Sequence, residues 1–385
     1  MGKGEFFAKK RILILSEGFG TGHTQAAHAL SFRLRQMNPG LNTRVMELGA
    51  FLHPTLAPWI FSAYRKTVSL QPKLYGLLYR NQYQKSLNRF AKLALHRIFY
   101  AQASTIMDQL KPDLIVCTHP FPTIIVSRLK QSGLNVPLCT LVTDYDAHGT
   151  WMASNVDKYF VSTEKVRQKF IEKGVDPDKI EVTGIPVHPS FQEKHDKQAI
   201  QKKFGLKNMP TVMIMGGGWG MLGKEMLDRI AVWRDQIQFL ICLGTNEKAR
   251  NLLMEEPSYT HPNIHIFGYT NEIDKLMEVS DLLITKPGGM TCTEAMAKGI
   301  PMLFYRSIPG QEEENCQYFT EQGFGEEITS FETVRIWFYK LLEQSTELKQ
   351  QREHRREAVK LWSEDCPNTI LAMLDMTADV SVPLS

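Results

Sequence analysis

The sequence predicts an α/β protein built from two doubly wound, Rossmann-like domains that face a cleft. Short apolar runs of strand length alternate with helical patterns along most of its 385 residues, as in parallel sheets covered by helices. Two glycine loops, at 18–22 and 216–220, each follow such a run and precede a helical pattern. With 43% hydrophobic residues, the chain is also long enough to fill two cores rather than one.

The segment at 184–189 marks the boundary between these domains. It contains one glycine and two prolines, a composition that suits an interdomain linker. We therefore expect a first domain at 1–188 and a second at 189–385, with the last helices able to pack back on the first domain.

The first domain opens with an apolar strand at 11–15, a glycine loop, and a helix with Ala26, Ala27, Leu30 and Leu34 on one face. Further strands are predicted at 43–48, 113–118, 136–142, 158–162 and 180–182. Ligands bind beyond the carboxyl ends of such strands, so the residues that follow them are the candidates for chemistry.

Three polar residues stand at those ends: His23, His119 and Asp144. The position of His23 at a helix N-terminus lowers the pKa of an imidazole and favours the neutral form that a general base requires. Asp144 can orient His23 or act as the base itself, and His119 is a third candidate; for each, a turn or cap role is the alternative. A dinucleotide site with Glu47 on the ribose fits less well, because His23 replaces the third glycine of G-x-G-x-x-G.

The second domain opens with a strand at 211–215, and a later part of its pattern predicts a phosphate-binding site. Other strands are predicted at 239–243, 263–267 and 281–285. A tight turn at 287–289 then precedes a helix at 291–298, whose N-terminal N–H groups favour an anion. Glu294 can accept hydrogen bonds from a ribose diol, while Gln311 and Asn315, four apart, can offer amides to another polyol. Together these describe a nucleotide sugar; an ordinary turn beside a solvated Glu294 is the alternative.

Composition excludes several classes of protein. The six cysteines are scattered without a C-x-x-C or Cys/His cluster, which argues against disulfides or zinc and favours a reduced cytoplasm. We find neither an apolar signal region nor an uncharged run of about 18 apolar residues. The formal charge of +4 is too small to indicate nucleic acid, and the mixed charges at 349–356 predict a solvated helix face.

One stretch, 48–107, contains no Asp or Glu and combines basic with aromatic residues. Such a surface can dock on anionic lipid, where each Lys or Arg contributes roughly 1 kcal/mol and aromatic rings anchor at the interface. A set of packing helices with a solvated basic face is the alternative. The candidates for membrane or acceptor contact are Trp59, Arg65, Lys66, Lys73 and Arg80.

Four of these segments resemble one known family. They are similar to the signature of the monogalactosyldiacylglycerol synthase and processive diacylglycerol β-glucosyltransferase family. The segments are the Gly-x-Gly-His element that ends at His23, the pair Thr143-Asp144, the run 286–294 and the run 309–315. These are glycosyltransferases of family 28 with the two-domain GT-B fold. By resemblance, the donor-binding residues are Gly22, His188, Gly217, Gly218, Tyr269, Lys286, Gly288, Gly289, Met290, Thr291, Glu294, Gln311, Glu312 and Asn315. At His188 the family usually has an arginine that helps to hold the donor diphosphate.

The resemblance implies an inverting transfer of a hexose from a UDP-sugar, with UDP-glucose the first choice, to a lipid acceptor such as diacylglycerol. His23, with Asp144 nearby, would deprotonate the acceptor hydroxyl. We expect no metal and no cofactor, with helix N-terminal amides stabilising the leaving diphosphate. The enzyme would work in the cytoplasm, peripherally on an anionic inner membrane surface.

Two other functions are compatible with a nucleotide-sugar site. A UDP-sugar 2-epimerase shares the fold and the donor loops but has no use for a basic aromatic surface. A noncatalytic UDP-sugar sensor would not need His23, Asp144 and Glu294 together. The pattern leaves open the hexose, the exact lipid, the number of sugars added, the oligomeric state and the choice between His23 and Asp144 as the base.

Overall fold

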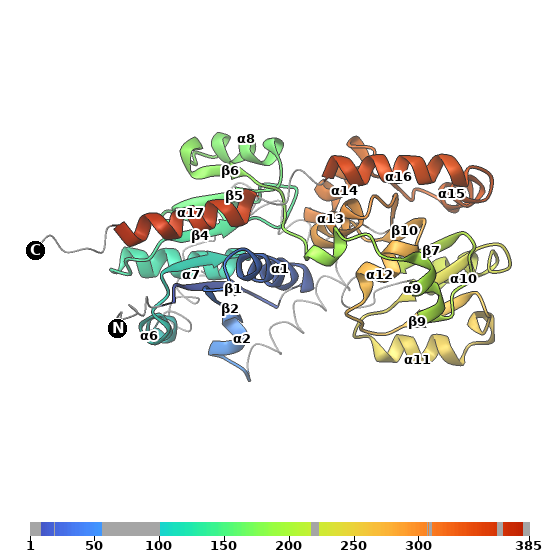
Figure 1. Ribbon diagram of the computed structural model, residues 1–385, viewed down its shortest axis with the longest axis horizontal. Coiled ribbons are helices and arrows are strands. Elements are labelled where there is room, and N and C mark those ends of the chain that lie inside the picture. Colours follow the sequence, from blue (N-terminus) through green and yellow to red (C-terminus); the bar gives the residue numbers. More distant parts are fainter. Residues whose placement is uncertain are drawn as a thin grey trace, which may run out of the picture. The chain divides into compact units, whose positions relative to one another are not determined.

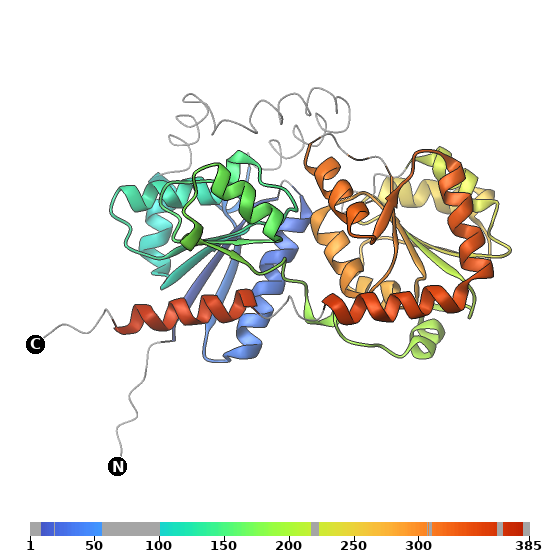
Figure 2. The ribbon, with the colours of Figure 1, turned by 90° about the horizontal axis from the view of Figure 1, so that it is seen from above.

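The computed structural model describes residues 9–18, 20–55, 101–216, 223–305, 307, 310–359 and 365–379. The chain forms two compact units, unit 1 (1–188 with 362–385) and unit 2 (189–361) (Figure 1). Each unit has a six-stranded sheet in which all strands run parallel, with helices packed on it (Figure 2). The predicted α/β class with two doubly wound sheets is confirmed.

Unit 1 has the strand order β2-β1-β3-β4-β5-β6. Its strands are β1 (Arg11–Ser16), β2 (Asn42–Glu47), β3 (Leu114–Cys117), β4 (Leu138–Leu141), β5 (Lys158–Val161) and β6 (Ile180–Val182). Its helices are α1 (Thr21–Met37), α2 (Leu48–Leu52), α6 (Ala101–Leu110), α7 (Pro120–Gln131), α8 (Glu164–Glu172) and α17 (Asp365–Asp379). The C-terminal α17 packs against α1, and Thr369 Oγ1 donates a hydrogen bond to Glu181 Oε1 at 2.6 Å.

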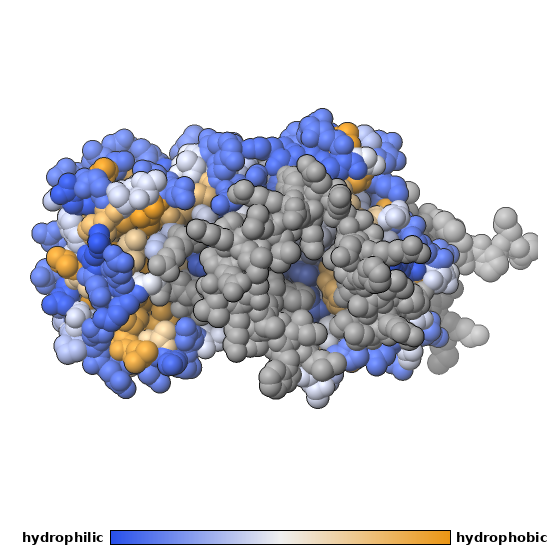
Figure 3. All heavy atoms as spheres, turned by 180° about the vertical axis from the view of Figure 1, so that it is seen from behind, coloured by the Kyte–Doolittle hydropathy of each residue, from blue (hydrophilic) through white to orange (hydrophobic). Residues whose placement is uncertain are grey.

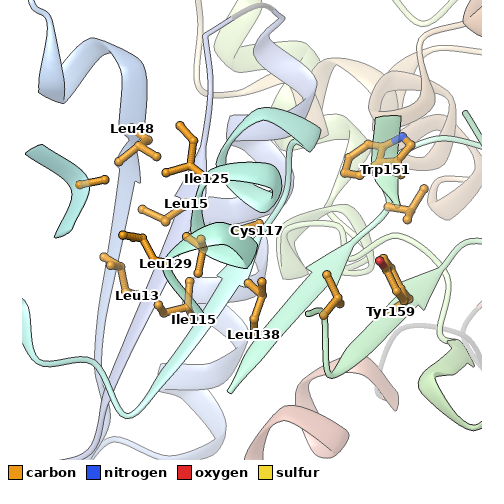
Figure 4. Packing of buried hydrophobic residues seen from close by; sticks show 14 of the residues in the cluster. Leu13, Leu15, Leu48, Ile115, Cys117, Ile125, Leu129, Leu138, Trp151 and Tyr159 are labelled. Carbon is orange, nitrogen blue, oxygen red and sulfur yellow. The ribbon is translucent and has the colours of Figure 1, made fainter. Parts of the chain in front are cut away.

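The core of unit 1 lies between this sheet and its helices (Figure 4). The four residues of β3 are completely buried, as expected for a parallel strand covered on both faces. In the cluster drawn in Figure 4, Leu13 and Leu15 of β1 pack with Ile125 and Leu129 of α7. This packed layer holds the carboxyl ends of β1, β3 and β4, and the candidate catalytic residues follow these strands.

Unit 2 has the strand order β12-β11-β10-β7-β8-β9. Its strands are β7 (Thr211–Met215), β8 (Gln238–Cys242), β9 (Ile264–Phe267), β10 (Leu282–Thr285), β11 (Met302–Phe304) and β12 (Gly325–Glu327). Its helices are α9 (Lys197–Phe204), α10 (Lys224–Ala231), α11 (Glu247–Glu255), α12 (Ile273–Val279), α13 (Gly289–Ala297), α14 (Gln311–Glu321), α15 (Phe331–Glu343) and α16 (Ser345–Val359). The sequence pattern did not predict β11 and β12, which have only three residues each.

The expected solvated face at 349–356 is found for Lys349, Glu353 and His354, which are exposed, but Arg352 and Arg356 of α16 are buried. Arg352 donates to three backbone carbonyls, including that of Lys298 at 3.0 Å. Arg356 Nη1 donates to Glu278 at 3.0 Å, and Lys298 Nζ reaches the other oxygen of the same carboxylate at 2.8 Å. A buried cation is stable only when it is paired, and these partners supply the pairing. The cluster fastens the C-terminal end of α13 to α12 and α16.

The face drawn in Figure 3 is hydrophilic over most of its described atoms and carries separate apolar patches on unit 2. The exposed large apolar side chains of this unit are Val232, Leu252, Met254, Tyr269, Ile336 and Tyr339. Among the described residues, no helix combines the length and the apolar character needed to span a membrane.

Candidate active site

The predicted loops lie where each sheet reverses its strand order. In unit 1 the chain passes from β1 outward to β2 and then returns to the other side of β1 with β3. In unit 2 the same reversal separates β7 from β10. Ligands of open parallel sheets bind at this switch point, beyond the carboxyl ends of the strands. His23 follows the loop after β1, in the first turn of α1. The loop after β3 contains His119, and the loop after β10 contains Gly288.

His23 lies in the first turn of α1, directly after the glycine loop. Its Nδ1 lies 3.1 Å from the carbonyl oxygen of Thr118 and 2.6 Å from Thr143 Oγ1. The Thr118 hydroxyl in turn donates to the backbone carbonyl of His23 at 3.0 Å. The end of β3 and the residue that follows β4 therefore hold the imidazole from two sides.

These contacts determine which nitrogen of His23 can accept a proton. A carbonyl oxygen only accepts hydrogen bonds, so the contact with Thr118 places the ring proton on Nδ1 and leaves Nε2 as the basic nitrogen. Burial lowers the pKa of His23 to about 4, against which the Thr118 contact acts weakly. The ring is thus neutral throughout the physiological range, as expected, although burial rather than the helix terminus is the cause.

His119 and Trp151 line the same imidazole. The His119 ring lies edge-on to His23 with centroids 4.7 Å apart, and Trp151 lies 6.0 Å away. His119 is the N-cap of α7, where its Nδ1 accepts from the N–H of Phe121 at 3.1 Å. Burial, and then the neighbouring His23, hold the pKa of His119 well below its usual value. A neutral ring committed to capping suits the cap role that was the alternative for His119.

Asp144 is buried at the carboxyl end of β4, one residue beyond Thr143. Trp151 Nε1 donates to Asp144 Oδ2 at 3.3 Å, and Ser162 Oγ donates to its backbone carbonyl at 2.7 Å. The indole thus connects the carboxylate with the wall of the His23 site. The hydroxyl that contacts Nδ1 of His23 belongs to Thr143, which the sequence reasoning did not select.

The donor loop of unit 2 presents an uncapped helix N-terminus. Gly288 is the N-cap of α13 and has no side chain to satisfy the first N–H groups. Its own N–H donates to the Lys286 carbonyl at 2.8 Å, which closes the predicted tight turn. The N–H groups of Gly289, Met290 and Thr291 come before the first helical hydrogen bond, so they can bind an anion at the positive end of the helix.

Glu294 lies on α13, two turns beyond the loop, and is half-buried. Its carboxylate has no hydrogen-bond partner within the described part of the chain. Burial, together with the nearby Asp274, raises the pKa of Glu294 to about 8. Asp274 itself is paired with His195 Nε2 at 3.0 Å. A half-buried carboxyl group without a partner is costly, so a ligand hydroxyl that donates to it would be favoured.

The three residues predicted on the hexose take different positions on α14. Gln311 and Glu312 form the first turn of this helix and are partly exposed. Asn315 is completely buried, and its Nδ2 donates to the carbonyl of Pro287 at 3.1 Å. In this structure Asn315 therefore supports the donor turn from below. Gly310 before the helix has φ 104°, a conformation open to glycine, and its N–H donates to Glu313 at 3.0 Å.

The remaining predicted donor residues are dispersed. Gly22 lies in the first turn of α1, Lys286 is half-buried after β10, and Tyr269 after β9 is 62% exposed. His188 packs on Phe32, with ring centroids 4.5 Å apart, within unit 1. Gly217 and Gly218, and the predicted membrane residues Trp59, Arg65, Lys66, Lys73 and Arg80, lie outside the described residues.

Comparison with known proteins decides the family. Residues 23–187 match the monogalactosyldiacylglycerol (MGDG) synthase family, and residues 211–362 match the C-terminal domain of glycosyltransferase family 28. The processive diacylglycerol beta-glucosyltransferase of Bacillus subtilis is 32% identical over 322 residues, which cover 82% of each chain. The chain belongs to the diacylglycerol glycosyltransferases of family 28.

Solved structures place this glycosyltransferase in the GT-B fold but do not separate its reaction from others. MurG of Acinetobacter baumannii is similar with a TM-score of 0.56 and 15% identity, covering 95% of this chain and 99% of its own. A UDP-GlcNAc 2-epimerase from Neisseria meningitidis, bound to UDP-GlcNAc, has a TM-score of 0.58 and 14% identity, with the same coverage. At this identity the likeness concerns the fold alone, so the family assignment depends on the sequence match.

Proposed function

We propose that this glycosyltransferase moves a hexose from a UDP-sugar, with UDP-glucose the first choice, to the hydroxyl group of a diacylglycerol-type lipid. The Bacillus subtilis relative is named for that reaction, and the two sites described above have the chemistry that it needs. The observation that supports it most strongly is the pair of contacts that Nδ1 of His23 makes with Thr118 and Thr143. A base that must take a proton from an alcohol needs an accessible unprotonated nitrogen, and the Nδ1 contacts assign that role to Nε2.

In the proposed reaction the proton of the acceptor hydroxyl moves to His23 Nε2. The acceptor oxygen attacks the anomeric carbon of the hexose while the bond from that carbon to the UDP oxygen breaks. UDP leaves with the bonding electron pair. Attack from the face opposite UDP inverts the anomeric configuration, so an α-linked donor gives a β-glycoside.

Unit 2 would bind the donor along α13. The N–H groups of Gly289, Met290 and Thr291 would hold the diphosphate and stabilise the charge that develops on it, while Glu294 accepts from the ribose hydroxyls. Gln311 and Glu312 at the start of α14 would contact the hexose, and the backbone at Gly268-Tyr269 would contact the uracil. These donor contacts use amides and one carboxylate, and we propose that no metal is needed.

We further propose that the acid-free stretch 48–107 brings the enzyme to its acceptor at the cytoplasmic face of an anionic membrane. Eight Lys and Arg residues interleave there with aromatic residues between Phe51 and Tyr100. Most of this stretch lies outside the described residues, so its composition is the support.

The test is a panel of UDP-sugars assayed for UDP release, with and without vesicles that contain diacylglycerol. We expect release that depends on the lipid and a glycolipid product with a β linkage. Recovery of an altered UDP-sugar in the absence of lipid would show the epimerase reaction instead. Binding of UDP-sugar without turnover of any acceptor would support the sensor.

A further inference from the structure

The glycine loop before His23 begins with a buried carboxylate that the proposed reaction does not use. Glu17 follows β1 directly and is completely buried. Its Oε2 accepts from the N–H of Gly49 at 2.6 Å, and its Oε1 accepts from the N–H of Gly18 at 3.3 Å. The N–H of Ala50 is a further donor to this carboxylate. Glu17 thus fills the capping place at the N-terminus of α2 from a distant part of the chain.

The other end of the loop is hydrogen-bonded to Glu47, the residue before α2. Thr24 follows His23, and its hydroxyl donates to Glu47 Oε1 at 2.8 Å. Ser16, at the end of β1, lies 3.2 Å from the same hydroxyl. Glu47 is the last residue of β2, immediately before α2. The β2–α2 junction, defined here as residues 47–50, therefore contacts the chain on both sides of the loop that ends at His23.

The fit between Glu17 and this junction leaves no room for a side chain at position 49. A Cβ atom on Gly49 would lie 2.6 Å from Glu17 Oε2 and 3.0 Å from its Cδ, closer than such atoms approach. Gly49 lies inside α2, where alanine would otherwise stabilise the helix. The glycine is thus explained by the close approach of the carboxylate.

We infer that the β2–α2 junction is a clamp that sets the position of His23 by holding both ends of its loop, with Glu17 as a positioning residue. Turnover depends on this clamp because Nε2 of His23 must meet the acceptor hydroxyl within hydrogen-bond distance. The inference depends on the proposed role of His23. It goes beyond that role by assigning a function in catalysis to residues that need not touch either substrate.

The pH dependence of turnover can distinguish a role of Glu17 in positioning His23 from a role in stabilising the fold alone. Burial, with Glu47 as the charged group acting on it, raises the pKa of Glu17 to about 7, while the contacts from Gly49, Gly18 and Ala50 act in the opposite direction. Protonation removes the charge that the three N–H groups face. Turnover should therefore fall as pH decreases through about 7, whereas His23, with its pKa of about 4, stays neutral in this window.

The test compares Glu17→Ala, Glu17→Gln, Gly49→Ala and the double variant Glu17→Ala/Gly49→Ala. We expect kcat to fall about 10- to 100-fold in Glu17→Ala and in Gly49→Ala, since small misplacements of a catalytic group have effects of this size. Gly49→Ala should have no further effect once Glu17 is truncated, and the double variant should melt no lower than Glu17→Ala. Affinity for UDP should be unchanged in all four, because α13 belongs to unit 2. Glu164→Ala on the exposed face of α8 is the matched control.

Glu17→Gln keeps one accepting oxygen and should remain folded, but its turnover should lose the decline near pH 7. Unchanged turnover in Glu17→Ala, or full additional loss on adding Gly49→Ala to it, would overturn the clamp. So would a decline of kcat near pH 7, measured at saturating UDP-sugar so that titration of Glu294 does not contribute, that persists in Glu17→Gln. These outcomes differ from failure of the proposed function, in which His23→Ala would itself retain turnover.

Discussion

His23 in unit 1 and Glu294 in unit 2 are both titratable groups whose pKa values are moved by burial, yet their surroundings differ. His23 Nδ1 is held by Thr118 and Thr143, and two further rings line the imidazole. The Glu294 carboxylate has no hydrogen-bond partner within the described residues. The difference supports our proposal that the base is oriented before any substrate arrives, whereas the donor carboxyl group gains its hydrogen-bond partner only when the ligand binds.

This contrast follows from the demands of each step. A general base must meet a hydroxyl in one geometry, and orientation by fixed neighbours avoids an entropic cost during reaction. A ribose brings its own donors, so an unpartnered acceptor gives affinity when the ligand binds. Substitutions at the two sites should therefore act on different quantities, turnover for His23 and UDP affinity for Glu294.

His23→Ala should have the largest effect on turnover. Removal of a general base lowers the rate by about 10²–10⁴-fold. The relevant measurement is UDP release from the donor with diacylglycerol vesicles, with His28→Ala on the exposed face of α1 as the control. If Asp144→Asn abolishes turnover while His23→Ala keeps it, Asp144 is the base.

Reversal of Arg65, Lys66, Lys73 and Arg80 to Glu should disturb neither site but remove access to the lipid. At roughly 1 kcal/mol for each basic residue near the headgroups, binding to anionic vesicles should fall by at least about 100-fold. Wild-type binding should also weaken with salt, because the Debye length shortens from about 10 Å at 0.1 M to about 3 Å at 1 M. Equal sedimentation of the two proteins with anionic vesicles would return this stretch to the solvated-face interpretation.

Glu294→Ala should reduce affinity for UDP by about tenfold, since one hydrogen bond to a charged group is lost. The pKa of Glu294, about 8, also predicts that protons are released when UDP binds, which calorimetry can measure. At pH 7 the free carboxyl group is mostly protonated, and a ribose that donates to the ionised form lowers its pKa. Binding should therefore release close to one proton more in wild type than in Glu294→Gln, measured in buffers of different ionisation enthalpy. Equal proton release in both would contradict the ribose assignment.

Thr143→Val should have the smallest effect, a loss of kcat of about tenfold, because Thr118 still holds Nδ1 of His23. Thr143→Ser keeps the hydroxyl and should restore turnover. Because Thr143 acts through His23, the UDP affinity of both variants should equal that of wild type. A Thr143→Val enzyme with wild-type kcat would mean that Thr118 alone orients the ring.

The sequence patterns that proved informative were local. Apolar runs identified strands such as 211–215 and 281–285, and glycine loops identified both switch points, because strand burial and turn conformation depend on neighbouring residues. The neutral ring of His23 was expected from its helix position, but burial is the cause that lowers its pKa. Family resemblance supplied what local patterns could not, the expectation that the nucleotide is UDP and that the acceptor is a lipid.

Contacts between distant segments escaped prediction. Thr143 lies 120 residues from His23, and the threonines at the ends of β3 and β4 are the only signal that the sequence offered for its contact. Arg352 and Arg356 looked solvated because their partners, such as Glu278, lie on another helix. The contact of Asn315 with the carbonyl of Pro287 was not predicted either, since helical spacing does not tell which helix face is buried.

Our central claim is that unit 1 supplies the base and unit 2 binds the donor. The most direct test is calorimetric titration of UDP into His23→Ala and Glu294→Ala, together with measurement of their turnover with diacylglycerol vesicles. We predict that His23→Ala binds UDP like wild type while transferring almost no sugar, and that Glu294→Ala binds UDP about tenfold more weakly. A His23→Ala protein that loses UDP affinity in proportion to its turnover would contradict the assignment of the base to the acceptor side and of the donor to α13.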